Sequence, residues 1–375
     1  MKEFLNRVRP VALVLLISTQ LVACGFGYYW QATSGHLSIM QKRQPVEDIV
    51  ADPGTPDAVR AKLQTASAAV EFAHRALLLP DNGSYQLYTD TGRRYVVWNV
   101  VATPEFSLQP RTWCFPVAGC VSYRGYFSEE HAIDFATGLA GGGDDTFVGG
   151  VAAYSTLGRF ADPLLNTMME FSDYQLAGLV FHELAHQLVY VKDDSKFNEG
   201  FASFVEEEGI YRWLRSRQAK NELCRYKLSS GRRRQVQELI LQARVQLESL
   251  YEQDIADEQK RAEKQELFNA LRQAYADLER SWANAVNFDH WFGRSLNNAQ
   301  LAALATYDDY VPAFAGLLRE DQGDLATFFA RVKALALLAD DQRRSEMQAL
   351  LQSEVEFTRD NDRRFDGTCP EGSAS

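Results

Sequence analysis

The stretch His182-Glu183-Leu184-Ala185-His186 decides the fold of this chain. Residues four apart on an α-helix lie on one face, so His182 and His186 can direct two imidazole nitrogens at one ion. Glu183 lies one position further round the helix, beside such an ion, where its carboxylate can accept a proton from water. The stretch therefore predicts a helix that carries two metal ligands and a general base.

A second motif, Asn198-Glu199-Gly200-Phe201-Ala202, contains the expected third ligand, Glu199. Catalytic zinc sites usually have three protein ligands and leave the fourth position to water. The polar run Lys192-Asp193-Asp194-Ser195 can turn the chain, and Asp194 or Ser195 can cap a second helix that carries Glu199. A His/His/Glu set with an adjacent glutamate base is the arrangement of thermolysin-like peptidases, although the connection is shorter here than in thermolysin.

The first of these helices is expected on independent grounds. Ser172 and Gln175 form the sequence of a capping box, and a broad apolar stripe follows it. The stripe consists of Leu176, Leu179, Val180, Leu184, Leu188 and Val189. The competing interpretation is an accidental match in which both histidines are ordinary core residues. Because the chain has only six histidines, two at this spacing around a glutamate favour a site for one zinc ion.

The first 23 residues have the pattern of a signal peptide: a basic start, an apolar run over residues 11–17 and small residues at the end. The ending Leu21-Val22-Ala23-Cys24 resembles a bacterial lipobox, which implies cleavage before Cys24 and acylation of its thiol. The alternative is an uncleaved anchor helix, for which the run is short. We expect a lipid-anchored protein of the bacterial cell envelope that faces the periplasm, and Gly25 favours the outer membrane over the inner one.

Four cysteines remain after Cys24, and in an oxidising compartment they can form two disulfides with three possible connectivities. Cys114 and Cys120 close a short loop and are the preferred first pair, which leaves Cys224 with Cys369. In a competing interpretation Cys114 and Cys120 bind a metal, but five intervening residues fit poorly with the usual spacings of zinc ligands.

The acidity of the chain limits its partners. The formal net charge is −11, and residues 1–23 carry three basic side chains and one acidic one, so the mature chain is near −13. Such a charge argues against a nucleic acid as partner.

The pattern along the chain predicts a predominantly helical α+β fold in five segments. They are a signal peptide (1–23), an N-terminal helical segment (24–80), a zinc peptidase core of thermolysin-like type with a small sheet beside the histidine helix (81–220), a long helical hairpin (221–290) and a C-terminal helical region (291–375). The hairpin has a charged, solvated tip over residues 254–264 and can offer a surface to a protein partner.

Strands are expected in two places within the predicted core. Residues 85–90 and 95–101 alternate around Thr91-Gly92 and predict a β-hairpin. A helix over residues 128–139 and a glycine-rich turn over 141–145 precede a strand over 146–156. In thermolysin-like enzymes an edge strand before the histidine helix pairs with an extended peptide, and residues 151–156 are placed for that role. The alternative is a plain core strand.

At this point the chain resembles a bacterial family of putative zinc aminopeptidases that are predicted lipoproteins. The resemblance covers nearly the whole mature sequence. It is carried by residues 113–127, 153–158, 162–163, 181–187, 197–202, 297–299 and 311–314. It implies a zinc peptidase in which His182, His186 and Glu199 hold the metal and Glu183 is the base.

Several roles stay open. The donor to a negatively charged intermediate is expected among Tyr154, Tyr307, Tyr310 and Arg124, with Tyr154 best placed by sequence. An aminopeptidase also needs a carboxylate for the α-ammonium group of a peptide substrate, and Glu105, Asp162 and Glu206 are candidates, although Glu206 fits a surface position better. The alternative functions are an envelope endopeptidase and a non-catalytic scaffold that binds a protein through the helical hairpin.

Overall fold

A computed structural model describes residues 27–115, 119–153, 155–282, 288–305 and 310–361. The structure is mostly helical with three small sheets, as the α+β expectation requires. The predicted signal peptide and Cys24 lie outside the described residues. No helix within the described residues is both long enough and apolar enough to cross a membrane.

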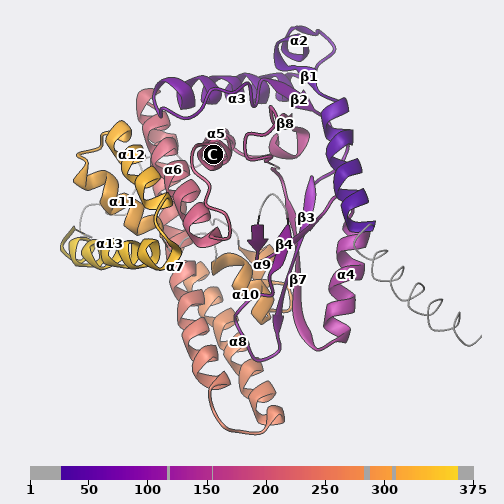
Figure 1. Cartoon of the computed structure of the whole chain (residues 1–375), viewed down its shortest axis with the longest axis vertical. Coiled ribbons are helices and arrows are strands. Elements are labelled where there is room, and N and C mark those ends of the chain that lie inside the picture. The colour runs from indigo at the N-terminus through magenta and orange to yellow at the C-terminus, as the bar shows by residue number, and fades with distance from the viewer. Residues whose placement is uncertain (1–26, 116–118, 154, 283–287, 306–309, 362–375) are drawn as a thin grey trace, which may run out of the picture.

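The principal sheet is antiparallel. Its central strand β3 (Val97–Pro104) pairs with β6 (Arg124–Tyr126) on one side and with β7 (Asp144–Val151) on the other. Side chains alternate between its faces. Trp98 and Val100 pack against α4 (Glu129–Gly141), which covers the outer face in Figure 1, whereas Val97 and Asn99 point into a cavity on the inner face.

The β-hairpin predicted over residues 85–101 is wrong. Residues 87–89 form β2 (Leu87–Thr89), which pairs with β1 (Gln44–Pro45) and, in parallel, with β8 (Leu164–Leu165), while the second half becomes β3. The turn exists locally, because Asp90 accepts a hydrogen bond from the Gly92 N–H. Thr91, however, donates its N–H and its hydroxyl to Asn166. Alternating apolar and polar residues predict a strand but not the strand it pairs with, and here β2 and β3 each pair with strands from other parts of the chain.

The strand predicted over residues 146–156 is also wrong in its bounds. The strand β7 begins at Asp144, within the expected turn, and ends at Val151. Beyond it, the side chains of Ser155 and Thr156 and the Thr156 N–H donate to the buried Asp162 carboxylate. Such local bonds to side chains compete with a strand ladder. Of the edge strand expected over residues 151–156, residues 152, 153, 155 and 156 are therefore not part of a strand, and residue 154 lies outside the described residues.

The free edge of β7 is covered in part. Asn297 donates its side-chain amide to the Thr146 carbonyl at 2.9 Å, and Arg294 donates to the Val148 carbonyl at 3.2 Å. These donors lie in a loop over residues 293–297. A segment far along the sequence thus covers part of an edge that would otherwise be open.

The main core is built by helices. The helix α3 (Asp57–Arg75) packs on α5 (Asp173–Leu188), which packs on α6 (Ser195–Ser216), and α11 (Val311–Glu320) and α12 (Leu325–Ala336) close the far side. Five fully buried phenylalanines of this core are Phe181, Phe197, Phe201, Phe314 and Phe328. The core therefore fixes α5 and α6 against each other.

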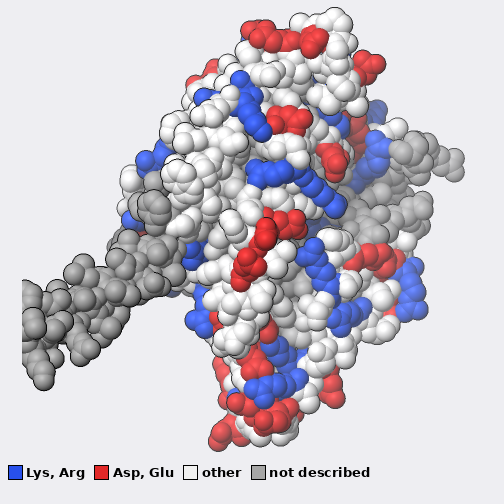
Figure 2. Space-filling view, turned by 90° about the vertical axis from the view of Figure 1, so that its right-hand side faces the viewer, with Lys and Arg blue, Asp and Glu red and all other residues white. Residues whose placement is uncertain are grey.

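The predicted helical hairpin is confirmed. It consists of α7 (Lys220–Tyr251) and α8 (Asp257–Arg280), which extend from the body at the bottom of Figure 1. Acidic and basic side chains are dense at this lower end in Figure 2. The tip is shorter than expected, because Lys264 already lies on α8 and donates to Asp145 and to the Glu105 carbonyl. The hairpin is thus bound to the sheet side of the body.

The other helices of the described residues are one over residues 27–41, α2 (Val46–Ala51), the short 3-10 helix η1 (Asn166–Met168), α9 (Asp289–Phe292), α10 (Asn298–Ala305) and α13 (Asp340–Asn361). The short strands β4 (Trp113–Phe115) and β5 (Gly119–Val121) form a separate two-stranded sheet. The segment boundaries given above remain a prediction.

Candidate metal centre

The helix that carries the two histidines begins as its sequence predicts. Ser172 is the N-cap of α5, and its N–H donates to Oε1 of Gln175 at 3.1 Å. The apolar side of α5 is buried in the core, with Leu176, Val180, Phe181 and Leu184 fully enclosed. His182 and His186 lie on the side that faces α6 and the cavity.

The second helix is held in register by two side chains of its first turn. Asp194 is the N-cap of α6 and accepts from the Phe197 N–H at 3.0 Å. Asn198, which is 2% exposed, accepts from the Val191 N–H and donates to the Val191 carbonyl, both at 2.7 Å. Asn198 thus fixes the loop before α6, and with it the position of the next residue, Glu199.

Three of the predicted residues converge. Nε2 of His182 lies 3.2 Å from Nε2 of His186, and Oε2 of Glu199 lies 3.5 Å from the first and 3.7 Å from the second. One ligand atom from each residue fits within a group whose members are no more than 4.8 Å apart. Two imidazole nitrogens and one carboxylate oxygen around a single point form a donor set that suits zinc.

Two glycines allow the helices to approach closely enough for this convergence. A Cβ atom on Gly178 of α5 would lie 2.5 Å from Cδ1 of Ile210, and one on Gly209 of α6 would lie 2.5 Å from Cδ2 of Phe181. A side chain at either position would have to displace Ile210 or Phe181. The two glycines therefore allow side chains of the facing helix to pack close to the backbone of α5 and α6.

Glu206 contacts Nδ1 of His182, the ring nitrogen that faces away from His186 and Glu199 and is called the outer nitrogen below. Nδ1 of His182 lies 3.1 Å from Oε2 of Glu206, one helical turn before Gly209. If Nδ1 carries the proton and donates it to this carboxylate, Nε2 keeps its lone pair for an ion. The surface position favoured for Glu206 is therefore wrong, because its carboxylate contacts the ring of His182.

The charges of the cluster favour a cation at its centre. Burial lowers the pKa of His182, but its hydrogen bonds with Glu199 and Glu206 outweigh burial and raise the pKa well above the usual value. Burial raises the pKa of Glu199, but the two imidazoles hold it far below its usual range. The carboxylates therefore stabilise a positive charge between them, which a proton or a metal ion can supply.

Glu183 meets the requirements of a proton acceptor. It is partly buried and lines the same cavity as the three converging residues. Burial raises the pKa of its carboxyl group, and the nearby histidines oppose that change. A carboxylate whose pKa is raised toward neutrality is a better general base at neutral pH than an exposed one.

The cavity has a volume of about 700 Å³ and is bounded by the principal sheet, α5, α6 and α7. This volume is in the range of sites for small ligands. Its wall is largely apolar, with polar groups gathered at the three converging residues. The apolar lining includes Val97, Phe115, Val121, Val151, Leu157, Leu179, Val236 and Ile240.

A profile of known protein families identifies the chain. The family described as "Putative aminopeptidase" matches residues 27–347, which contain every residue of the site. The chain belongs to the putative aminopeptidase family. No curated protein and no solved structure matched the chain. Family membership supports peptidase activity and a peptide substrate in general terms.

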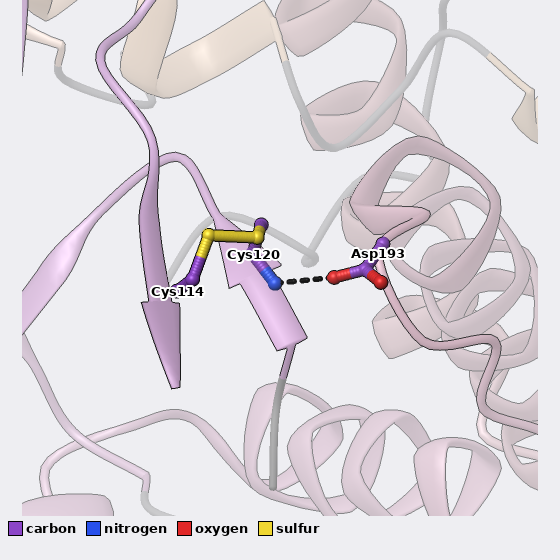
Figure 3. The surroundings of a disulfide bond; sticks show 3 residues. All are labelled: Cys114, Cys120 and Asp193. Atoms are coloured by element: carbon purple, nitrogen blue, oxygen red, sulfur yellow. Dashed lines mark hydrogen bonds between the residues drawn. A yellow bond between two sulfur atoms is a disulfide. The ribbon is translucent and has the colours of Figure 1, made fainter. Parts of the chain in front are cut away.

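In this aminopeptidase family member a disulfide supports the wall of the cavity. The predicted bond between Cys114 and Cys120 is present and joins β4 to β5 (Figure 3). The Cys120 N–H donates to the carboxylate of Asp193, in the loop between α5 and α6. Gly119 permits this contact, because its φ is +77° and a Cβ atom there would lie 2.4 Å from Oδ1 of Asp193.

The second predicted disulfide includes Cys369, which lies outside the described residues. Cys224 itself is disulfide-bonded. The pairing of Cys224 with Cys369 stays a prediction.

None of the four candidates for the hydrogen-bond donor to a negatively charged intermediate is a described residue that lines the cavity. Tyr154 and Tyr307 lie outside the described residues. Tyr310 is buried against Gly200 and Lys196, and Arg124 stacks on Tyr28 and Phe135, so neither lines the cavity.

Three tyrosines that the sequence did not single out for this role line the cavity instead: Tyr28, Tyr123 and Tyr190. Burial raises the pKa of Tyr123, and the negative charge of Glu199 raises it further, so its hydroxyl stays protonated. Tyr123 belongs to a stretch that carries the family resemblance, but no local pattern indicates which way it points.

None of the three expected carboxylates is available for an α-ammonium group. Glu105 accepts two hydrogen bonds from Arg261 of the helical hairpin, and it does not line the cavity. Asp162 is fully buried and accepts from the loop after β7 and from Gln187. Glu206 contacts His182. Each is already committed to a structural contact.

Proposed function

We propose that this chain is a zinc-dependent aminopeptidase that hydrolyses short peptides. The observation that carries the proposal is the convergence of His182, His186 and Glu199 on one point, with Glu183 beside them in the same cavity. Family membership adds support for the peptidase class.

Zinc fits the residues at this point. His182, His186 and Glu199 would hold the ion, and these two nitrogen donors and one oxygen donor match the ligand sets of catalytic zinc. The contact between Glu206 and Nδ1 of His182 is the outer carboxylate contact that orients a ligating imidazole. The two facing helices α5 and α6 make the arrangement comparable to the thermolysin-like peptidases named above.

The proposed chemistry assigns a task to each residue. A bound zinc ion supplies a water of lowered pKa and a positive charge near the carbonyl oxygen of the substrate. Glu183 accepts a proton from the attacking water and returns it to the leaving amine nitrogen. Tyr123 or Tyr190 can donate a hydrogen bond to the oxygen that becomes negative, and the earlier candidate Tyr154 keeps that role as a prediction.

We also propose that the mature chain begins at Cys24, carries a lipid there and works in the periplasm of a bacterial envelope. The support is the sequence of residues 1–25, with its basic start, apolar run and Leu-Val-Ala-Cys ending. Peptides that reach the periplasm would then be the substrates. Mass measurement of the mature N-terminal peptide tests this, because an uncleaved, unmodified Cys24 contradicts it.

The test of the zinc peptidase uses matched variants. Glu183→Gln should keep stoichiometric zinc and lose about 10²- to 10⁴-fold in kcat on unblocked peptides. His182→Ala should lose zinc as well as activity, whereas His131→Ala, which replaces an exposed histidine of α4, should change neither. Metal analysis of the purified proteins and a peptide-library digest give both readings. Full hydrolysis by Glu183→Gln would refute the proposal.

Two alternatives give different results in the same assays. An endopeptidase cleaves peptides with blocked amino ends, so cleavage of blocked peptides alone would replace the aminopeptidase assignment. A scaffold that binds a protein partner through the hairpin would keep its cellular role in Glu183→Gln. Exposed Leu241 and Val245 on α7 offer an apolar surface for such a partner.

A further inference from the structure

The helical hairpin contributes one wall of the catalytic cavity. Four residues of α7 line it, and three of them (Arg233, Gln237 and Ile240) lie at helical spacings of four and three. The fourth, Val236, is buried between them. The root of the hairpin is therefore part of the site, while its tip lies at the far end of the molecule (Figure 1).

Arg233 is the cation of this wall. Within the part of the chain that the structure describes, it is the one lysine or arginine that lines the cavity, whereas four glutamates do so: Glu183, Glu199, Glu206 and Glu207. Burial raises the pKa of Glu206, and the charge of Arg233, after the contact with His182, helps to lower it. Arg233 therefore lies near enough to Glu206 to interact with its carboxylate.

Its neighbours on α7 are placed differently. Arg232 stacks over the ring of Trp282, with 5.5 Å between its guanidinium carbon and the ring centre. Arg234 is exposed and does not line the cavity. Arg233 itself makes no hydrogen bond and no ion pair within 4 Å to any described residue, and it is exposed to solvent. Among three consecutive arginines, Arg233 alone lines the cavity, and no described residue forms a hydrogen bond with its guanidinium.

A free guanidinium in such a cavity recognises a carboxylate. Its planar fork donates two parallel hydrogen bonds to one carboxylate group, and it stays charged at every physiological pH. A cavity of about 700 Å³ is large enough to hold a short peptide, so the C-terminal carboxylate of such a substrate can lie inside it. The carboxylate that every short peptide carries is its C-terminal one.

We propose that Arg233 binds the terminal carboxylate of the substrate and thereby selects short peptides with a free C-terminus. This inference rests on the proposed peptidase function, since it names the substrate class of that same site. It also gives the hairpin a role in the reaction, because the hairpin positions the residue that limits substrate length.

The test compares peptide pairs that differ only at the C-terminus. Wild-type protein should hydrolyse tripeptide acids with a higher kcat/KM than the same tripeptide amides. In Arg233→Ala the value for the acids should fall about 10- to 100-fold, chiefly through KM, while the value for the amides should fall much less. Arg233→Lys should restore part of the loss, and Arg234→Ala should behave as wild type.

Three results would overturn the inference. Equal losses on acids and amides would mean that Arg233 acts through Glu206 and His182 and not on the substrate. Equal rates of acids and amides in the wild type would mean that no terminal carboxylate is recognised. A dependence on Arg233 seen with amidated peptides that carry an aspartate side chain, and not with the simple acids, would make a side-chain carboxylate the ligand.

A binding measurement separates this inference from the proposed function. Calorimetry with Glu183→Gln measures the affinity for a tripeptide acid and its amide without hydrolysis. If the wild type hydrolyses no peptide but the acid still binds more tightly in an Arg233-dependent way, the carboxylate site stands and the peptidase function fails. If hydrolysis occurs but neither affinity nor rate depends on Arg233, the peptidase function stands and this inference fails.

Discussion

Replacement of Glu206 tests whether the outer nitrogen of His182 is held for metal binding. The Nδ1 to Oε2 distance of 3.1 Å is a hydrogen bond between a ring N–H and a carboxylate. Glu206→Ala removes it, so the imidazole of His182 can rotate and exchange the proton between its nitrogens. Glu206→Gln keeps an acceptor oxygen and removes only the charge. Both variants should therefore bind zinc more weakly than the wild type, and alanine should have the larger effect.

The size of the effect follows from the contact. A hydrogen bond to a charged group contributes about 1.5–3 kcal/mol, and loss of an outer carboxylate partner typically weakens metal binding roughly 10- to 100-fold. The Glu206 side chain is 30% exposed, so water screens part of its charge, and we take the lower half of that range. We expect about 10- to 30-fold weaker zinc binding for Glu206→Ala and about 3- to 5-fold for Glu206→Gln.

Competition with a chelating dye measures these affinities. Glu208→Gln is the matched control, because Glu208 lies on the same helix but pairs with Arg212. An affinity of Glu206→Ala within twofold of the wild type would refute the assigned role of the contact. A loss as large as that of His182→Ala would refute it in another way, since Glu206 would then be a ligand itself.

Three further predictions concern the framework of the site. Asn198→Ala leaves the N–H and the carbonyl of Val191 without their partners at 2.7 Å, so the free energy of unfolding in urea titrations should fall by about 2–4 kcal/mol. Asn221→Ala, at an exposed position of α7, should not change it. An unchanged unfolding midpoint in Asn198→Ala would show that the Asn198 side chain does not hold the loop at Val191. The double variant Cys114→Ser with Cys120→Ser opens a loop of about seven residues, so the free energy of unfolding in urea titrations should fall by about 2 kcal/mol. An unchanged free energy of unfolding would show that the disulfide adds nothing to stability. Gly209→Val should overpack the contact with Phe181, lower the free energy of unfolding by about 1–3 kcal/mol and weaken zinc binding. Gly231→Ala, whose added Cβ meets nothing within 4 Å, should stabilise α7 by about 0.5–1 kcal/mol. Normal zinc affinity in Gly209→Val would show that the spacing of α5 and α6 does not control the site.

The local features of the site could be predicted from the sequence. The spacing of His182 and His186 is a property of one helix, and the capping box at Ser172 marks where that helix begins. The N-cap at Asp194 likewise marks the start of α6 and so orients Glu199. Each of these depends on contacts within a few residues, for which helical periodicity and capping rules suffice.

Features that depend on distant partners could not be predicted in this way. The strands β2 and β3 were expected to pair with each other because they are adjacent in sequence, but their partners lie up to 76 residues away. The loop after β7 was expected to be extended, and the buried carboxylate of Asp162 directs its hydrogen bonds instead. Alternation in a sequence does not identify a partner that the rest of the fold brings close.

The surface position predicted for Glu206 was wrong for a different reason, and the sequence does contain a pattern that points to its true position. Glu199 and Glu206 are seven residues apart, so they lie on one face of α6, two turns apart along the axis. That face is turned to α5 by Gly178 and Gly209, and the ring of His182 lies between the two carboxylates, 3.5 Å from the first and 3.1 Å from the second. Each of the two ring nitrogens thus lies near one carboxylate. In a chain with this motif pair, an acidic residue seven positions after the third ligand is therefore a candidate for the outer partner of the first histidine, even where flanking glutamates suggest a solvated surface.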